Sequence, residues 1–202
     1  MTSPKFLFAA AVGAAIAAST VGTAPAQPHL TRIRGTIEKI DGSVLSVFAR
    51  ELGEIKLTVA PGAQIFGVVK ATLSDVKPNS FVGVGAMPQA DGSQKAIQLT
   101  IFAESMRGLG EGFRPWAQPG STMTNGTVDT TIAAVEGQVL TVRYKNGEQK
   151  IIVTPDSTIR AYVASDKSEL KPGANISTFA TKRPDGTFEA SRVSVGRDGI
   201  AP

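Results

Sequence analysis

Residues 151–195 read IIVTPDSTIRAYVASDKSELKPGANISTFATKRPDGTFEASRVSV, and residues 57–101 read LTVAPGAQIFGVVKATLSDVKPNSFVGVGAMPQADGSQKAIQLTI. The two stretches align without a gap. The matches continue upstream, where the chain contains a Gly-Thr-Ile/Val triplet in each copy (Gly35-Thr36-Ile37 and Gly126-Thr127-Val128). A pattern of this length that recurs along a chain indicates one structural unit used twice.

Each copy has the alternation of apolar and polar residues that is typical of short strands. In the second copy, VLTVRY and QKIIVT flank Asn146-Gly147, and Asn-Gly between two such runs is a strong signal for a β-hairpin. Asp91-Gly92 and Asp185-Gly186 occupy matching hairpin positions in the two copies. Five or six short strands separated by turns predict a small closed barrel or a sandwich, and closure would leave no adhesive edges.

A Ser-acid-apolar-Lys-Pro element occurs once in each copy, at residues 74–78 and 168–172. We expect one short helical turn there, capped by Ser74 or Ser168 and ended by the proline. Val76 and Leu170 should point into the core.

The chain resembles a bacterial domain family of unknown function, family 5666, whose members are exported and often occur in tandem. The resemblance covers both copies and rests on turn glycines and core apolar residues, which in the first copy are Gly35, Ile37, Ile40, Gly42, Leu45, Val47, Val59, Pro61, Ile65, Ser74 to Pro78, Val82, Val84, Asp91, Gly92 and Ala96. It implies a small OB-like barrel and export, and it implies no activity.

We therefore expect an all-β protein with two tandem small OB-like β-barrels joined by an ordered Gly/Pro-rich connector. The expected boundaries are a signal peptide at 1–26, barrel repeats at 32–103 and 125–196, the connector at 104–124 and a C-terminal tail at 197–202.

The N-terminus has the features of a secretory signal peptide. Lys5 precedes an apolar run from Phe6 to Ala18, and Ala24-Pro25-Ala26 is an A-x-A cleavage site. We expect cleavage after Ala26 and a periplasmic or secreted mature chain without a transmembrane segment. An uncleaved membrane anchor is the alternative.

Composition excludes several classes of site. The chain has no cysteine and a single histidine, His29, so thiolate and imidazole metal sites and a Ser-His-Asp triad are not expected. The formal net charge is +4, and the basic residues are scattered rather than gathered in a run, as in nucleic-acid-binding arms. We predict no cofactor, no metal and no nucleic-acid partner. Four phenylalanines in apolar contexts, which a nucleic-acid-binding barrel would expose, are expected to face the core: Phe48, Phe66, Phe81 and Phe102.

The connector breaks the alternation that the rest of the chain shows. Its Gly108-Leu109-Gly110-Glu111-Gly112 run does not satisfy G-x-G-x-x-G, because residue 113 is phenylalanine, and no Lys-Ser/Thr follows as in a P-loop. It also carries Trp116, the only tryptophan, and exposed aromatic residues would be costly in a free linker. The connector is either a wedge between the barrels or a recognition site. The candidate ligand- or partner-binding residues are Glu104, Arg107, Glu111, Phe113, Arg114 and Trp116.

These features favour a non-enzymatic exported protein that binds or scaffolds an envelope protein through the connector. A carrier of a small ligand or metal ion, with its site at the connector, is the first alternative. An enzyme that acts on envelope glycans through a carboxylate pair is the second, since such enzymes place two acids on either side of the bond.

Overall fold

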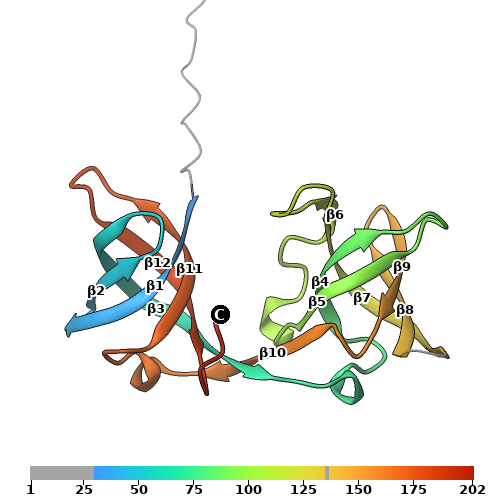
Figure 1. Cartoon of the computed structure of the whole chain (residues 1–202). Coiled ribbons are helices and arrows are strands. Elements are labelled where there is room, and N and C mark those ends of the chain that lie inside the picture. The colour runs from blue at the N-terminus through green and yellow to red at the C-terminus, as the bar shows by residue number, and fades with distance from the viewer. Residues whose placement is uncertain (1–29, 135–136) are drawn as a thin grey trace, which may run out of the picture.

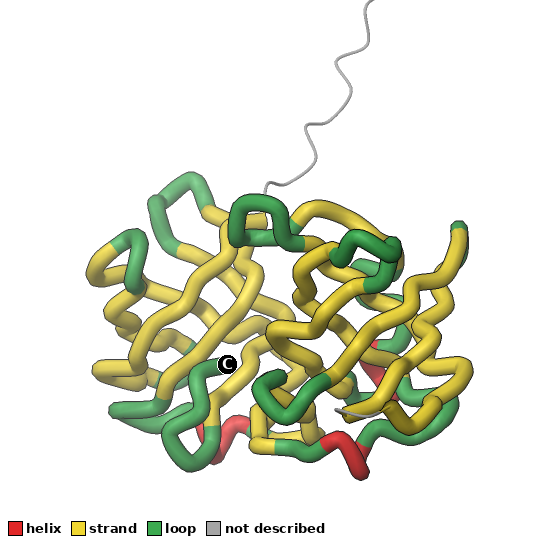
Figure 2. Tube along the Cα trace, turned by 45° about the vertical axis from the view of Figure 1, so that its right-hand side comes forward, coloured by secondary structure: helices red, strands yellow, loops and turns green. Residues whose placement is uncertain are grey.

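The computed structural model describes residues 30–134 and 137–202, so the expected signal peptide at 1–26 and His29 lie outside the described residues. The protein is all-β, as the alternation predicts, with three short 3-10 turns (Figures 1 and 2). In the described part of the chain, no helix has the length and apolar character needed to span a bilayer.

Ring 1 is a closed five-stranded barrel. It contains β1 (Leu30–Asp41), β2 (Val44–Ala49), β3 (Gly53–Lys70), β11 (Asn175–Lys182) and β12 (Phe188–Gly196). Neighbouring strands pair in the order β12-β11-β1-β2-β3, and β3 then pairs in parallel with β12 to close the ring. Apolar side chains from all five strands, including Ile33, Val47 and Val193, fill its interior.

Ring 2 repeats this arrangement with other strands. It contains β4 (Phe81–Pro88), β5 (Gln94–Ile101), β7 (Thr122–Ala134), β8 (Gly137–Tyr144) and β9 (Gly147–Val153). The order is β5-β4-β7-β8-β9, and a short parallel pairing of β9 with β5 completes the ring. A separate apolar cluster that includes Val84, Leu99 and Leu140 fills this ring.

The rings do not coincide with the two sequence repeats. Ring 1 takes three strands from the first repeat and two, β11 and β12, from the second, whereas ring 2 takes β4 and β5 from the first repeat and the rest from the second. The expectation that repeats 32–103 and 125–196 each fold onto themselves therefore differs from the observed pairing. The repeats exchange their last two strands within one chain.

The length of β3 explains the exchange. This strand runs for 18 residues, pairs with β2 and β12 of ring 1, and pairs through its last residues with β10, so that the chain leaves ring 1 before the next strands of the first repeat begin. Because the two repeats offer similar strand surfaces, each pair of displaced strands finds an equivalent site in the other ring, as in domain swapping.

Two crossing strands join the rings. The C-terminal part of β3 pairs with β10 (Thr158–Ser165), and β10 pairs in turn with β5 (Figure 1). A row of aromatic rings crosses the same junction: Phe66 of β3 lies edge-on to Tyr162 of β10, which stacks on Phe102 at a centroid distance of 5.6 Å, and Phe102 contacts Phe81 of β4. Backbone pairing and this aromatic row fix how the rings face each other.

The two predicted helical turns are present, but their caps differ from the prediction. The turns are η1 (Leu73–Asp75) and η3 (Lys167–Glu169), and Val76 and Leu170 are buried after them as expected. The capping residues are Thr72, whose backbone N–H and hydroxyl both donate to the carboxylate of Asp75, and Asp166, which accepts a hydrogen bond from the backbone of Ser168. The turn begins two residues earlier in each copy than the serine suggests.

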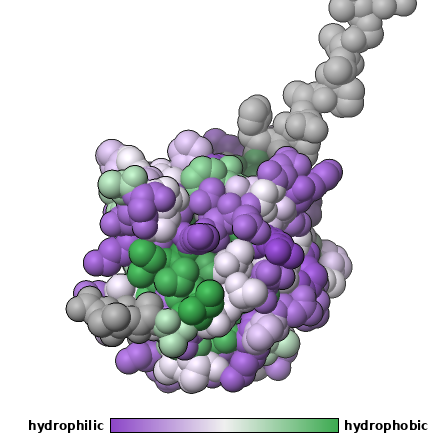
Figure 3. Space-filling model, turned by 90° about the vertical axis from the view of Figure 1, so that its right-hand side faces the viewer, coloured by the Kyte–Doolittle hydropathy of each residue, from purple (hydrophilic) through white to green (hydrophobic). Residues whose placement is uncertain are grey.

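Outward-facing apolar residues are the other departure from the sequence pattern. Phe48 was expected in the core but is 54% exposed, because it lies between the inward residues Val47 and Ala49 on β2. On ring 2, Ile132, Val139 and Ile152 are cross-strand neighbours on the outer side of β7, β8 and β9. Figure 3 looks at the side of the molecule formed by ring 2, where apolar residues gather among hydrophilic ones.

Candidate functional site

The expected connector is ordered and lies on ring 2. We call residues 102–121 the strap. It contains the turn η2 (Glu104–Met106), whose Met106 is buried, and the short strand β6 (Gly112–Pro115), which pairs with the first residues of β7. The last three residues of the expected connector, 122–124, belong to β7 itself.

Arg107 fastens the first half of the strap. Its guanidinium donates to both carboxylate oxygens of Glu104 and also to the carbonyl of Asn79 and the hydroxyl of Thr127. The hydrogen bonds from Arg107 lower the pKa of Glu104. These two candidate residues are therefore engaged with each other and with ring 2.

The next three candidate residues lie apart from that pair. The Glu111 carboxylate accepts a hydrogen bond of 2.9 Å from the backbone N–H of Lys145, where β8 ends. Arg114 donates to the carbonyl of Gly110, and Phe113 is 42% exposed on β6. Glu104 and Glu111 thus have separate structural partners: Glu104 pairs with Arg107, and Glu111 accepts from the backbone at the end of β8.

Trp116 is the candidate residue that reaches the space between the rings. Its indole packs on the backbone of Gly85 in β4, where a side chain would collide with it. Its other side lines a pocket of about 220 Å³ that ring 1 also lines. The sixth candidate is therefore in a position to contact a ligand.

Four arginines line this pocket, which we call the arginine pocket. Arg32 and Arg34 come from β1, Arg50 follows β2, and Arg160 comes from β10. Its remaining lining residues are Gly35, Gln98, Trp116, Ala117, Asn175, Ile176, Ala201 and Pro202.

Strand geometry explains why the arginines converge. Arg32 and Arg34 flank the fully buried Ile33, so both side chains point outward on the same face of β1. The backbone N–H of Arg50 donates to the carbonyl of Arg34, which places Arg50 beside it. Arg160 is held by hydrogen bonds to the hydroxyl of Thr100 and the carbonyl of Ala201.

The pocket has an excess of positive charge. Among the described residues, Glu51 forms an ion pair with Arg34, and the other three guanidinium groups have no carboxylate partner. Burial, followed by the charge of Arg34, lowers the pKa of Arg32, and Arg160 acts in the same direction. The Nε of Arg34 is buried without a hydrogen-bond partner in the described structure. An anion in the pocket would relieve the repulsion among the guanidinium groups.

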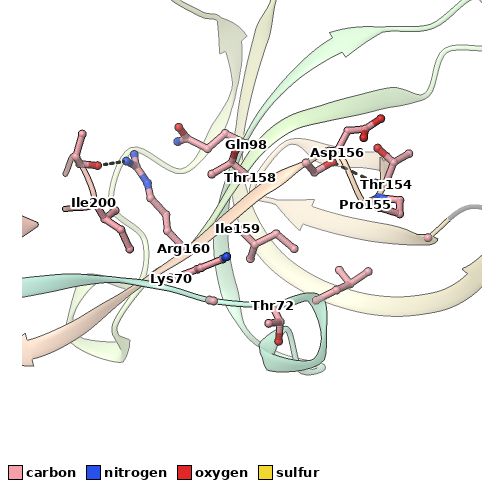
Figure 4. Close-up of a pocket in the computed structure, with 15 residues that line it drawn as sticks. Lys70, Thr72, Gln98, Thr154, Pro155, Asp156, Thr158, Ile159, Arg160 and Ile200 are labelled. Atoms are coloured by element: carbon pink, nitrogen blue, oxygen red, sulfur yellow. Dashed lines mark hydrogen bonds between the residues drawn. The ribbon is translucent and has the colours of Figure 1, made fainter. Parts of the chain in front are cut away.

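A larger groove continues from the arginine pocket. It encloses about 840 Å³ between the start of β10, the segment after β3 and residues 200–201, and shares Gln98, Arg160 and Ala201 with the pocket (Figure 4). Ile159 and Ile200 supply apolar surface, and Lys70 adds another cation. The two hollows therefore form one cleft, with Arg160 between them.

The arginine pocket is not apparent from the sequence, because Arg160 is far along the chain from the other three arginines. One local signal was available: Arg32-x-Arg34 in an alternating strand places two cations on one face. Arg50 follows from the pairing of β1 with β2, whereas Arg160 could be found only from the pairing that brings β10 beside β3.

Among the described residues, no group of three or more His, Asp or Glu side chains is placed to hold a metal ion. No protein-family model, curated protein or solved structure matches the chain. The resemblance to family 5666 therefore stays a prediction, and the function must be argued from the site itself.

Proposed function

We propose that this protein is a non-enzymatic binding protein that holds an anionic ligand in the cleft between its two rings. The observation that carries the proposal is the convergence of Arg32, Arg34, Arg50 and Arg160 on one pocket, where the ion pair formed by the described residues is that of Arg34 with Glu51. Guanidinium groups bind carboxylates and phosphates through paired hydrogen bonds, so these are the ligand groups that the pocket fits best.

The uncharged residues that line the pocket would select among anionic ligands. The amides of Gln98 and Asn175 can donate and accept hydrogen bonds beside the arginines, and the indole of Trp116 offers an aromatic surface. An anion that also carries hydroxyl or apolar groups would use more of this lining than a simple inorganic ion.

We infer that the rings are two OB-like barrels that have exchanged strands. In ring 1, β1, β2 and β3 form an antiparallel meander, β12 pairs in parallel with β3, and β11 pairs with both β12 and β1. In ring 2, β7, β8 and β9 form the meander, β5 pairs in parallel with β9, and β4 pairs with both β5 and β7. This order supports the OB-like assignment. OB folds bind oligosaccharides and oligonucleotides on their outer surface, which is also where the arginine pocket lies.

The proposal draws on both of the leading sequence-based hypotheses. An exported mature chain would encounter anionic small molecules, anionic polymers and acidic proteins of the cell envelope. The cationic lining favours an anion over a metal ion in this cleft. A glycan-acting enzyme would need a carboxylate pair, and Glu104 and Glu111 have separate structural roles.

Titration of the mature chain with inorganic tripolyphosphate and with citrate tests the proposal. Trp116 is the only tryptophan and lines the pocket, so its fluorescence reports binding there, and calorimetry gives the affinity. We expect saturable binding that weakens as salt is added. No heat and no fluorescence change with either anion would contradict the proposal.

Matched variants locate the binding site. Arg50→Gln removes a cation from the pocket. The Arg50 side chain forms no hydrogen bond in the described structure, so we expect the stability of the fold to be unchanged. Arg192→Gln, at an arginine that contacts Gln64 and does not line the pocket, is the control for net charge. Arg50→Gln should weaken binding about tenfold, by loss of one charge-assisted contact, and Arg192→Gln should not.

A further inference from the structure

In ring 2, an added strand of the same chain pairs with the free edge of the first meander strand. Strand β6 pairs with Thr122–Asn125 of β7, on the edge that β8 leaves free. Within that pairing, Gly112 lies opposite Asn125 and Arg114 lies opposite Met123. The edge of β7 is therefore completed by an added strand from the same chain.

Ring 1 has the equivalent edge on β1. By the sequence repeat, Gly35-Thr36-Ile37 corresponds to Gly126-Thr127-Val128, so residues 31–34 correspond to residues 122–125. Residues 30–36 of β1 pair with β11, whereas β2 pairs only with residues 35–41. In the part of the chain that the structure describes, no strand pairs with the other edge of residues 30–34.

The backbone groups at this edge can be assigned from strand alternation. The carbonyl of Arg34 accepts a hydrogen bond from Arg50, so Arg34 directs its backbone toward the β2 side. Alternate residues of a strand direct their backbone groups to the same side, so the N–H and C=O of Arg32 also point to that side. No hydrogen bond to either group of Arg32 is formed there by the described residues.

Charge distinguishes this edge from its counterpart in ring 2. The outward side chains beside it are Arg32 and Arg34, where β7 carries Met123 and Asn125. The Arg32 guanidinium also lies 5.9 Å from the ring centroid of Phe179, which is 58% exposed on β11. A strand added here would place its own alternate side chains directly beside the two arginines.

We propose that ring 1 binds an extended acidic peptide segment of a partner protein, which adds as a strand to the edge of β1 at residues 30–33, next to the point where Arg50 pairs with Arg34. The backbone of one acidic residue of the segment pairs with Arg32, and the side chain of a second acidic residue two positions away reaches the guanidinium of Arg34. This mode of recognition combines main-chain pairing for affinity with side-chain charge for specificity. The inference rests on the proposed anion-binding function and names the class of partner.

A designed peptide tests strand addition on the mature chain. It alternates threonine and valine, with two glutamates two positions apart. The first control has the same composition with adjacent glutamates, which cannot both face the arginines. The second control carries N-methyl groups on the two glutamate amides, which removes the backbone donor and keeps the charge. We expect the designed peptide to bind about tenfold more tightly than either control, and the amide hydrogen of Arg32 to become protected from exchange.

The outcomes separate the two proposals. Equal affinity for the N-methylated peptide, with no protection of the Arg32 amide, overturns strand addition and leaves anion binding in place. Absence of binding by the peptide and by tripolyphosphate overturns both. Tighter binding of a single-stranded oligonucleotide that displaces the peptide overturns the assignment of the partner as a protein segment.

Discussion

The indole of Trp116 packs against the bare backbone of Gly85: a Cβ built on Gly85 would stand 2.3 Å from Cζ3 of the ring. Real Cβ atoms essentially never approach another heavy atom so closely, so this position requires glycine while Trp116 is in place. The contact joins the strap to β4 and holds Trp116 at the arginine pocket. In the second repeat the residue that corresponds to Gly85 is Phe179, whose side chain is exposed.

Gly85→Ala should displace Trp116. We expect a red-shifted, more easily quenched fluorescence and a loss of about 1–3 kcal/mol in the free energy of unfolding, as for other overpacked sites. Denaturation of the same substitution in a Trp116→Ala background is the control, because the colliding ring is then absent. Equal losses in both backgrounds would show that the contact does not account for the glycine.

Arg107→Ala should weaken the attachment of the strap without reducing anion binding. Arg107 bonds to Glu104, Asn79 and Thr127, and none of these residues lines the arginine pocket. We expect a loss of about 1 kcal/mol in urea denaturation. Arg114→Ala, which removes only the bond to Gly110, should cost less. A large fall in affinity for tripolyphosphate in Arg107→Ala would place this residue in the binding site after all.

Local features of the fold could be predicted from the sequence because local chemistry determines them. Asp91-Gly92 and Asp185-Gly186 form turns between paired strands, and each aspartate accepts a hydrogen bond from the backbone two residues later, Ser93 or Thr187. Val76 and Leu170 are buried as the pattern requires.

The partners of β11 and β12 could not be predicted. Residues 81–101 and 175–195 carry similar patterns, so either segment fits either ring, and only the course of β3 out of ring 1 along β10 decides between them. Of the candidate site residues, Trp116 lies at the arginine pocket. The arginines that make the pocket basic come from three separate segments, and the spacing of Arg32 and Arg34 on β1 connects only the first two of them.

A cut in the strap tests the strand exchange. With a protease site inserted between Gly108 and Gly110, cleavage yields one fragment for each repeat. Because each ring contains strands from both repeats, we expect the fragments to stay together in size-exclusion chromatography and to separate only in denaturant. Two folded fragments that elute separately under native conditions would contradict the exchange.

Acid should weaken the attachment of η3 to the end of β12. Glu169 accepts hydrogen bonds from Arg197, which lower its pKa below the ordinary value of 4.5. A carboxyl with a lower pKa in the folded state stabilises the fold above its unfolded-state pKa, and this contribution disappears as the pH falls through the folded-state pKa. We therefore expect the melting temperature to decline below pH 4.5.

The Glu169→Gln variant should show a shallower decline over the same range, because it lacks the titrating group. Glu54→Gln, at an exposed glutamate without an ion pair in the described structure, is the control and should follow the wild type. If Glu169→Gln and the wild type lose stability in parallel, the pair does not contribute to the acid response.

The most direct test of the binding site is a nuclear magnetic resonance titration of the arginine Nε–H and tryptophan indole signals with tripolyphosphate. We expect the signals of Arg32, Arg34, Arg50, Arg160 and Trp116 to shift together and saturate, while those of Arg143, Arg183 and Arg192, which do not line the pocket, stay in place. Saturating shifts at the latter arginines, with the pocket signals unchanged, would contradict the assignment of the cleft as the anion site.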